Sequence, residues 1–210
     1  MPSVFFPPFC AWFLVGLAFT NATDATNAAS TNHLAQAERP AFWAIKLDKQ
    51  GLRNFYRVST NLYRGAQPAR EGMAELKAMG IKTVVDLRAF HSDKEKLGNT
   101  GLAYERFHVE PWHAEDEDVI RFLKIATDTN NLPVFVHCEH GADRTGAMCA
   151  MYRIAVCGWT KDEAIAEMTR GGFGFHPEWQ NLIHYVRHAD IEKINHDAGL
   201  DNRPQDSSKK

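Results

Sequence analysis

The segment between residues 133 and 146 constrains the fold of this chain more than any other part of its sequence. A short apolar run, residues 133–136, leads into a loop that carries glycine, and a helix-forming run begins at Ala147. That order predicts a strand, a tight loop and a helix, which together direct several backbone N–H groups at one anion. The loop places Cys138 six positions before Arg144. The segment therefore predicts an anion site with a thiol at its base.

Each residue type in this loop has a chemical use if the anion is a phosphate. A helix N-terminus and nearby cations lower the pKa of a cysteine thiol from about 8.5 to roughly 3.5–7.5, so a thiolate becomes available. We expect Cys138 to attack phosphorus and carry a phosphocysteine intermediate, while the Arg144 guanidinium binds two phosphate oxygens. Gly141 allows the backbone amides to turn inward, and Thr145 can donate its hydroxyl to the departing thiolate. We expect His137 to orient the loop through its ring nitrogens.

A metal site is the main alternative interpretation of the loop. Residue types that can bind a metal ion are present at His137, Cys138, His140 and Asp143. Zinc sites generally carry paired ligands at spaced positions, and the sequence supplies no second pair. Arg144 and the neighbouring glycines also disfavour a purely structural cysteine. We therefore predict a site that uses neither a metal nor a cofactor.

The loop resembles the signature of the protein tyrosine phosphatase superfamily. Residues 137–146 read His-Cys-x-x-Gly-x-Asp-Arg-Thr-Gly, a form similar to that of bacterial and plant-fungal atypical dual-specificity phosphatases. Upstream, residues 54–58 (Asn-Phe-Tyr-Arg-Val) and 62–68 (Leu-Tyr-Arg-Gly-Ala-Gln-Pro) resemble the segment that opens the domain in that group. Downstream, residues 151–156 and 171–174 are similar to the exported bacterial branch.

The resemblance extends over residues 41–192 and implies the fold and the reaction of that family. We expect an α/β domain with a central, mostly parallel sheet flanked by helices. The implied reaction is a cofactor-free, two-step hydrolysis of phosphotyrosine in proteins, with phosphoserine and phosphothreonine as further substrates. Cys138 and Arg144 take the matching catalytic roles. The loop residues expected to bind the substrate are Glu139, His140, Gly141, Ala142, Asp143 and Thr145.

A general acid that protonates the leaving oxygen is harder to place. The resemblance implies an aspartate on a mobile loop that follows the strand before the signature. The corresponding segment, residues 110–118, departs from this pattern because no single aspartate has an unambiguous position. We expect the acid to be Asp116 or Glu115, ahead of Glu110 and His113. Acidic residues here also stabilise the first turn of a following helix, so at least two of them are expected to be structural.

The charge of the signature loop bears on the substrate. Glu139 and Asp143 place two carboxylates there, which disfavours polyanions such as phosphoinositides and inositol phosphates. An aspartate directly before the arginine nevertheless also occurs in family members that act on inositol phosphates. Phosphotyrosine or a phosphoprotein is therefore the preferred substrate, and an inositol phosphate or phosphoinositide is the alternative. A non-catalytic phosphate-binding domain is a further alternative, although the intact pair of Cys138 and Arg144 favours an enzyme.

The rest of the chain indicates one domain with a separate N-terminal segment. The 210 residues are 44% hydrophobic, enough for one substantial core, and the net charge of -2 gives no general attraction to nucleic acid. Residues 9–19 form an apolar run of signal-peptide length, although no Lys or Arg precedes it. We predict a signal peptide at 1–22, a disordered linker at 23–40, the phosphatase domain at 41–192 and a disordered tail at 193–210. The protein would then be exported to the periplasm without a membrane span. The alternative is a disordered apolar leader or an uncleaved anchor.

Local patterns predict the elements of the domain. We expect strands at 62–64, 81–87, 104–109 and 133–137, helices at 68–79, 119–128, 161–170 and 177–190, and a loop at 90–101. Thr160 and Glu163 form a capping box at the start of the helix over 161–170. Strands that alternate with helices favour a layered α/β domain with a largely parallel core.

Overall fold

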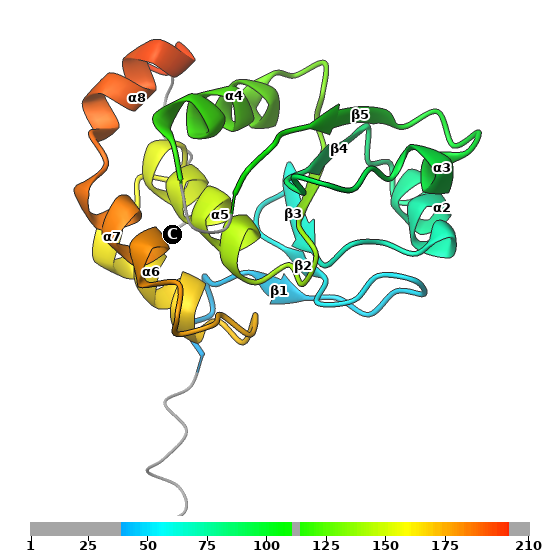
Figure 1. Ribbon diagram of the computed structural model, residues 1–210, viewed down its shortest axis with the longest axis horizontal. Coiled ribbons are helices and arrows are strands. Elements are labelled where there is room, and N and C mark those ends of the chain that lie inside the picture. Colours follow the sequence, from blue (N-terminus) through cyan, green and yellow to red (C-terminus); the bar gives the residue numbers. More distant parts are fainter. Residues whose placement is uncertain (1–38, 111–113, 202–210) are drawn as a thin grey trace, which may run out of the picture. The chain divides into compact units, whose positions relative to one another are not determined.

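A computed structural model of the protein describes residues 39–110 and 114–201 (Figure 1). The predicted signal peptide, nearly all of the predicted linker, and His113 lie outside the described residues. Within those ranges, no helix is long and apolar enough to cross a membrane. Export to the periplasm stays a prediction.

The centre of the domain is one six-stranded sheet with the order β1-β2-β3-β6-β4-β5 (Figure 1). Its strands are β1 Ile45–Lys46, β2 Tyr56–Arg57, β3 Leu62–Gly65, β4 Thr83–Asp86, β5 Ala103–Arg106 and β6 Val134–His137. The four strands β3, β6, β4 and β5 are parallel, whereas β1 and β2 form an antiparallel edge. Every residue of β4 and β6 is buried, as expected for inner strands covered on both faces. The predicted α/β fold with a mostly parallel sheet is confirmed.

Helices cover both faces of the sheet. They are α2 Arg70–Ala78, α3 Lys94–Leu97, α4 Asp116–Thr127, α5 Asp143–Ala155, α6 Lys161–Arg170, α7 Gln180–His188 and α8 Ile191–Ala198. The alternation of side chains along β6 separates two cores: Phe135 packs in a cluster with α2 and α3, whereas Val134 and Val136 join the larger cluster under the other helices. The large cluster surrounds α5, which is buried along nearly its whole length. This burial fixes the start of α5 directly behind the signature loop.

The helix over Lys161–Arg170 has the bounds that its end signals predict. The Thr160 side chain accepts a hydrogen bond from the Glu163 backbone N–H, and the Glu163 carboxylate accepts one from the Thr160 N–H. Gly171 follows as the C-cap. Capping is a local interaction, so the sequence pattern was sufficient here.

The predictions for residues 90–101 and for the C-terminal tail are wrong in part. The short helix α3 interrupts the expected loop, and the expected last helix ends at His188 instead of continuing to 190. A further helix, α8, occupies residues 191–198, which include the start of the predicted disordered tail. Asp190 caps it by accepting a hydrogen bond from the Lys193 N–H at 3.0 Å, and Ile194 is fully buried. The few apolar residues of this helix alternate with charged and polar ones, so the composition of the segment predicted disorder.

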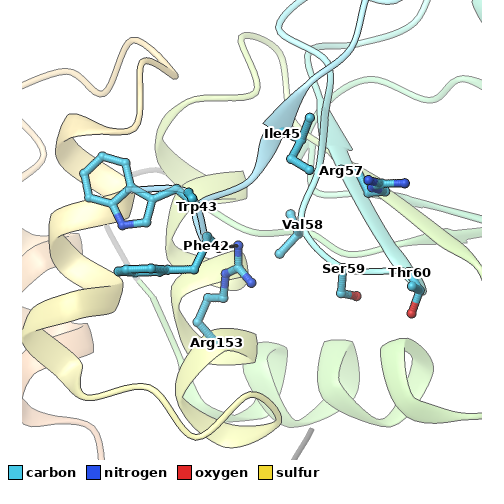
Figure 2. A pocket seen from close by; sticks show the side chains of 9 residues that line it. Phe42, Trp43, Ile45, Arg57, Val58, Ser59, Thr60 and Arg153 are labelled. Carbon is cyan, nitrogen blue, oxygen red and sulfur yellow. Dashed lines mark hydrogen bonds between the residues drawn. The ribbon is translucent and has the colours of Figure 1, made fainter. Parts of the chain in front are cut away.

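A buried ion pair joins the N-terminal part of the domain to its helices. Arg153 on α5 donates two hydrogen bonds of 2.9 Å to the Glu167 carboxylate on α6. The same carboxylate accepts the Ala44 N–H at 2.6 Å, and Arg153 also donates to the Phe42 carbonyl at 3.4 Å. Arg153 and Phe42 both line a pocket of about 340 Å³. Figure 2 shows their side chains near each other at this pocket. The pair therefore anchors residues 42–44 against α5 and α6.

We expect Glu167→Gln to lower the free energy of unfolding by about 3–5 kcal/mol, because it leaves the buried Arg153 guanidinium without its countercharge. Urea unfolding of the two proteins measures the difference. Asp162→Asn is the matched control, since its pair with Arg187 is 3.6 Å long and solvent-exposed, and we expect a loss of at most about 1 kcal/mol. Equal losses in the two variants would contradict the anchoring role.

Candidate active site

The signature loop lies at the carboxyl edge of the parallel sheet. His137, the last residue of β6, is in register with Gly65 at the end of β3 and with Asp86 at the end of β4. The segments that follow these three strands therefore meet at one edge, which is where open α/β sheets bind their ligands. Cys138 begins the loop and is only 2% exposed. The site is thus assembled from several segments that are distant in sequence.

The carbonyl groups of residues 138–142 all accept hydrogen bonds from donors outside the loop. The donors are His137 Nδ1 to Cys138 at 3.2 Å, the Gln67 N–H to Glu139 at 3.1 Å, Asn54 Nδ2 to His140 at 2.9 Å, and Arg64 Nη2 to Gly141 at 2.7 Å and to Ala142 at 3.3 Å. Because a carbonyl oxygen only accepts, the first of these bonds requires a proton on His137 Nδ1. The backbone of the loop is therefore held in one orientation by His137 and by donors from residues 54–67.

The N–H groups of the loop consequently face the opposite way. In a trans peptide the C=O and the following N–H point in opposite directions, so outward carbonyls at 138–142 turn the N–H groups of 139–143 inward. Gly141 has φ +71°, and a Cβ atom there would lie 2.3 Å from the Gly65 carbonyl oxygen. No other residue fits this position. The result is a ring of donors around the space above Cys138, suited to a tetrahedral oxyanion.

Arg144 is half-buried at the first turn of α5. Its Nη1 donates to the carbonyl of Leu87 at 3.2 Å and to that of Val109 at 3.3 Å. These two residues follow β4 and β5, so the guanidinium is held between the segments that lead away from the sheet. Such anchoring fixes the planar fork beside the loop, as a bidentate phosphate ligand requires.

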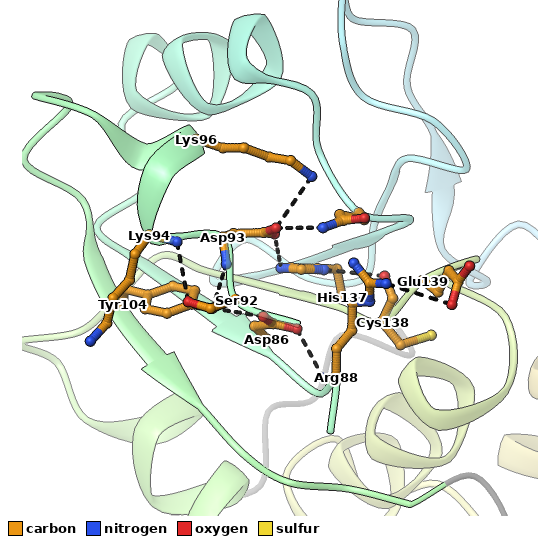
Figure 3. A network of polar contacts seen from close by, with 11 residues as sticks. Asp86, Arg88, Ser92, Asp93, Lys94, Lys96, Tyr104, His137, Cys138 and Glu139 are labelled. Carbon is orange, nitrogen blue, oxygen red and sulfur yellow. Dashed lines mark hydrogen bonds and ion pairs between the residues drawn. The ribbon is translucent and has the colours of Figure 1, made fainter. Parts of the chain in front are cut away.

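A buried polar network lies next to His137 and Cys138 (Figure 3). His137 Nε2 is 3.3 Å from Asp93 Oδ2, and the other Asp93 oxygen accepts the side-chain amide of Gln67. The Tyr104 hydroxyl donates to Asp86 at 2.7 Å and accepts the Asp93 N–H at 2.9 Å. Burial lowers the pKa of His137, and burial together with the Asp86 bond raises the pKa of Tyr104 to about 12. Asp93 thus binds the Gln67 side chain and faces His137, although Asp93 Oδ2 and His137 Nε2 have no hydrogen-bond partner among the described residues.

Three members of this network could together hold a metal ion. Asp86, Asp93 and His137 offer ligand atoms within 4.8 Å of one another. Both Asp86 oxygens already accept hydrogen bonds, from the Arg88 N–H at 2.9 Å and from the Tyr104 hydroxyl, and Asp93 faces His137. The Asp86 carboxylate is therefore fully hydrogen-bonded, whereas Asp93 Oδ2 and His137 Nε2 have no hydrogen-bond partner among the described residues. Of the four ligands considered from the sequence, this group contains His137 alone.

The two loop carboxylates have cationic or basic partners. Asp143 accepts the His176 N–H and pairs with His176 Nδ1, both at 2.9 Å, and Glu139 lies 3.7 Å from Arg88. The hydrogen bond to Asp143, followed by its charge, raises the pKa of His176. The His140 ring lies 5.7 Å from that of His176. Asp143 therefore connects the loop to the segment before α7, and the two carboxylates give no basis for excluding polyanionic substrates.

The acidic candidates for the leaving-group proton lie in different surroundings. Asp116 accepts the Tyr185 hydroxyl at 2.9 Å and lies 3.5 Å from Lys193, so it connects α4 to α7 and α8. Glu115 and Glu110 line a hollow of about 220 Å³ together with His108 and Asp118. Burial, and then the charge of Glu115, raises the pKa of Asp118.

Several residues that shape the site have no role that the sequence predicts. Asn54 stands at φ +51° and donates both to the His140 carbonyl and to that of Phe173, so it bridges the loop and the segment before α7. Arg64 is 1% exposed and packs 3.7 Å from the centre of the Phe173 ring. Asn54 and Arg64 stand inside the two upstream segments that resemble the family, which was the available signal. Asp93 and His176 had no such signal.

Comparison with known proteins identifies the family. The family model described as "DSP-PTPase phosphatase fused to NAD+ Kinase" matches residues 36–176. The chain belongs to this DSP-PTPase family. It is 39% identical over 162 residues to the dual specificity protein phosphatase TpbA of Pseudomonas aeruginosa (strain UCBPP-PA14), an alignment covering 75% of this chain and 72% of that protein. The resemblance seen in the sequence is confirmed.

Solved structures of TpbA have the same fold as this DSP-PTPase. The crystal structure of P. aeruginosa TpbA aligns with a TM-score of 0.69 at 34% identity, covering 79% of this chain and 100% of that one. The complex of a TpbA variant with pTyr aligns with a TM-score of 0.69 at 33% identity and the same coverage. A more distant relative, the inositol diphosphatase DSP3 of Arabidopsis thaliana, is 27% identical over 54% of this chain and 60% of its own length.

We expect Arg64→Met to lower kcat/KM for an aryl phosphate about tenfold to a hundredfold, because two loop carbonyls lose a charged donor worth about 1.5–3 kcal/mol. Circular dichroism checks that the variant folds. Arg64→Lys keeps the charge without the planar fork and should show an intermediate loss. A folded Arg64→Met protein with unchanged kcat/KM would contradict the role of these bonds.

The pair of His176 and Asp143 should make stability depend on pH. The pKa of His176 is raised in the folded protein, so its contribution is fully present below the unfolded value of about 6.5 and is lost as pH rises through the folded value. We expect His176→Gln to lower the midpoint of thermal unfolding more at about pH 5.5 than at about pH 8.5. A difference between the two proteins that grows with pH would contradict this pairing.

Proposed function

We propose that this chain is a cysteine-dependent phosphatase that hydrolyses phosphotyrosine in proteins, with phosphoserine and phosphothreonine as further substrates. The observation that carries the proposal is the position of Cys138 at the base of a loop whose carbonyls, at residues 138–142, all accept hydrogen bonds from surrounding donors. The relationship to TpbA, a named dual specificity protein phosphatase, supports it. So does the phosphotyrosine bound in the TpbA complex, because that fold aligns with this one.

In the first step the Cys138 thiolate attacks phosphorus, and the bond from phosphorus to the tyrosine oxygen breaks. The inward N–H groups of residues 139–143 and the Arg144 guanidinium stabilise the charge on the non-reacting phosphate oxygens. A general acid gives its proton to the leaving phenolate oxygen. The products of this step are the dephosphorylated tyrosine and a phosphocysteine.

In the second step water attacks the phosphorus of the phosphocysteine, and the deprotonated general acid accepts a proton from this water. The bond from phosphorus to Cys138 Sγ breaks, and inorganic phosphate is released. The Cys138 thiolate is now the leaving group and needs a donor. Thr145 Oγ1 is fully buried and has no hydrogen-bond partner among the described residues. A buried hydroxyl without a hydrogen-bond partner destabilises the fold, so its presence needs a functional reason. Donation of a hydrogen bond to the departing thiolate would supply that reason for Thr145.

The direct test is hydrolysis of an aryl phosphate by the wild type and by Cys138→Ser, which we expect to lose at least about a thousandfold in kcat. Cys149→Ala is the matched control. Burial raises the pKa of the Cys149 thiol to about 11, so it cannot replace the nucleophile, and we expect activity near that of the wild type. Phosphate on Cys138 in acid-quenched samples, detected by mass spectrometry, would establish the intermediate. Retained activity in Cys138→Ser would refute the mechanism.

For the general acid we favour Glu115 over Asp116 because of its position, since the Asp116 carboxylate faces α7 and α8 through Tyr185 and Lys193. Glu115 shares its hollow with Glu110, which directly follows the carbonyl that binds Arg144. We expect Glu115→Gln to slow hydrolysis of a substrate with a poor leaving group by at least about a hundredfold and to remove the basic limb of the pH profile.

Asp116→Asn is the matched comparison for this assignment, and we expect it to change kcat/KM less than about threefold. Both variants are tested on phenyl phosphate and on a nitrophenyl phosphate, since an activated leaving group needs little protonation. The reverse pattern, with the basic limb lost only in Asp116→Asn, would assign the acid to Asp116 instead.

An inositol phosphate phosphatase is the second candidate. It is supported by the partners of the two loop carboxylates. Arg88 lies near Glu139 and His176 binds Asp143, so these carboxylates repel a polyanion less strongly. The relationship to the inositol diphosphatase DSP3 is consistent with it. Comparison of kcat/KM for phosphotyrosyl peptides and inositol phosphates decides between the two candidates.

A further inference from the structure

A second hollow lies at the same edge of the sheet as the signature loop. It has a volume of about 620 Å³ and is lined by Gly51, Arg53, Gln67, Pro68, Ala69, Arg70, Glu71 and Lys96. Residues 67–71 follow β3, and Lys96 lies on α3, which comes after β4 in the chain. Because β3 and β4 end level with His137, the walls of the hollow start at the catalytic edge.

The hollow also shares a wall with the signature loop. Gln67, one of its lining residues, donates its N–H to the Glu139 carbonyl at 3.1 Å and its side-chain amide to Asp93. Lys96, another lining residue, is 3.3 Å from Asp93 (Figure 3). Two lining residues therefore contact Asp93, whose Oδ2 lies 3.3 Å from Nε2 of His137, the residue that precedes Cys138. The hollow therefore adjoins the outer side of the loop, beside the Glu139 carbonyl.

The charges around the hollow are mainly positive. Arg53, Arg70 and Lys96 line it, with Glu71 as the opposing charge, although the whole chain carries a net charge of -2. Lys96 is partly neutralised by Asp93. Arg53 and Arg70 are exposed, and within residues 39–110 and 114–201 neither forms an ion pair. Two guanidinium groups thus remain available to an external anion.

The backbone under the two arginines is fixed. The Gly51 carbonyl accepts the Ala69 N–H at 3.0 Å, and the Arg53 carbonyl accepts the Ala66 N–H at 2.9 Å. Gly51 has φ +72°, and a Cβ atom there would lie 2.4 Å from the Gly72 nitrogen. The backbone at Gly51 therefore packs directly against the backbone of α2. The positions of both arginines relative to the loop are therefore set by the fold.

We propose that this hollow binds acidic side chains that flank the phosphorylated residue, and that the enzyme prefers acidic phosphopeptides. The proposal rests on the proposed phosphatase function. An extended peptide advances about 3.3 Å per residue, so a residue a few positions from the phosphotyrosine reaches beyond the loop to the adjoining surface. Arg53 and Arg70 present forked donors that suit carboxylates. The loop would fix the phosphate group, while the hollow selects the sequence around it.

The test compares three substrates: a small aryl phosphate, a phosphotyrosyl peptide with Asp and Glu flanking the tyrosine, and the same peptide with Asn and Gln. We expect the wild type to prefer the acidic peptide through a lower KM. In Arg53→Ala/Arg70→Ala the KM for the acidic peptide should rise about fivefold, from two exposed pairs. Its kcat, and kcat/KM for the aryl phosphate, should stay unchanged.

The double variant Lys77→Ala/Lys82→Ala removes the same charge from exposed positions outside the hollow and should keep the preference for the acidic peptide. Equal KM values for the two peptides in the wild type, or equal effects of the two double variants, would overturn this inference while leaving the phosphatase activity in place. Failure of the wild type to hydrolyse the aryl phosphate would instead refute the proposed function.

Discussion

The architecture of the site depends on the outward hydrogen bonds of one short loop. Five successive carbonyls, at residues 138–142, accept bonds from His137, Gln67, Asn54 and Arg64. Planar trans peptides then turn the following N–H groups toward the space above Cys138. The energy of orienting these dipoles is supplied by folding and not by the substrate, so the charge of the transition state meets donors that are already aligned.

This constraint explains why the surrounding elements have their positions. Level ends of β3, β4 and β6 bring Gln67 and Asp93 beside the loop, and the buried α5 holds Arg144 at its first turn. Gly141 and Gly65 approach so closely that neither backbone can move away without loss of the Arg64 bonds. The chemistry is therefore a property of the sheet edge as a whole.

The sequence predicted what local patterns determine. The strand, loop and helix around Cys138 and the capped helix Lys161–Arg170 depend on neighbours within a few residues. Arg64 lies 77 positions before the carbonyl of Gly141 that it binds, so its role as a donor depends on strand register, and its place in a segment that resembles the family was the only signal in the sequence. The same reason applies to Asp143, whose carboxylate pairs with His176 thirty-three positions later, a contact that local patterns cannot indicate.

The most direct test of this account is a crystal structure of the Cys138→Ser protein with phosphotyrosine bound. The account predicts phosphate oxygens within about 2.7–3.2 Å of the backbone nitrogens of 139–143 and of the Arg144 guanidinium. The loop carbonyls should keep their bonds to Gln67, Asn54 and Arg64. A phosphate held mainly by side chains elsewhere, or a loop carbonyl turned toward the phosphate, would contradict it.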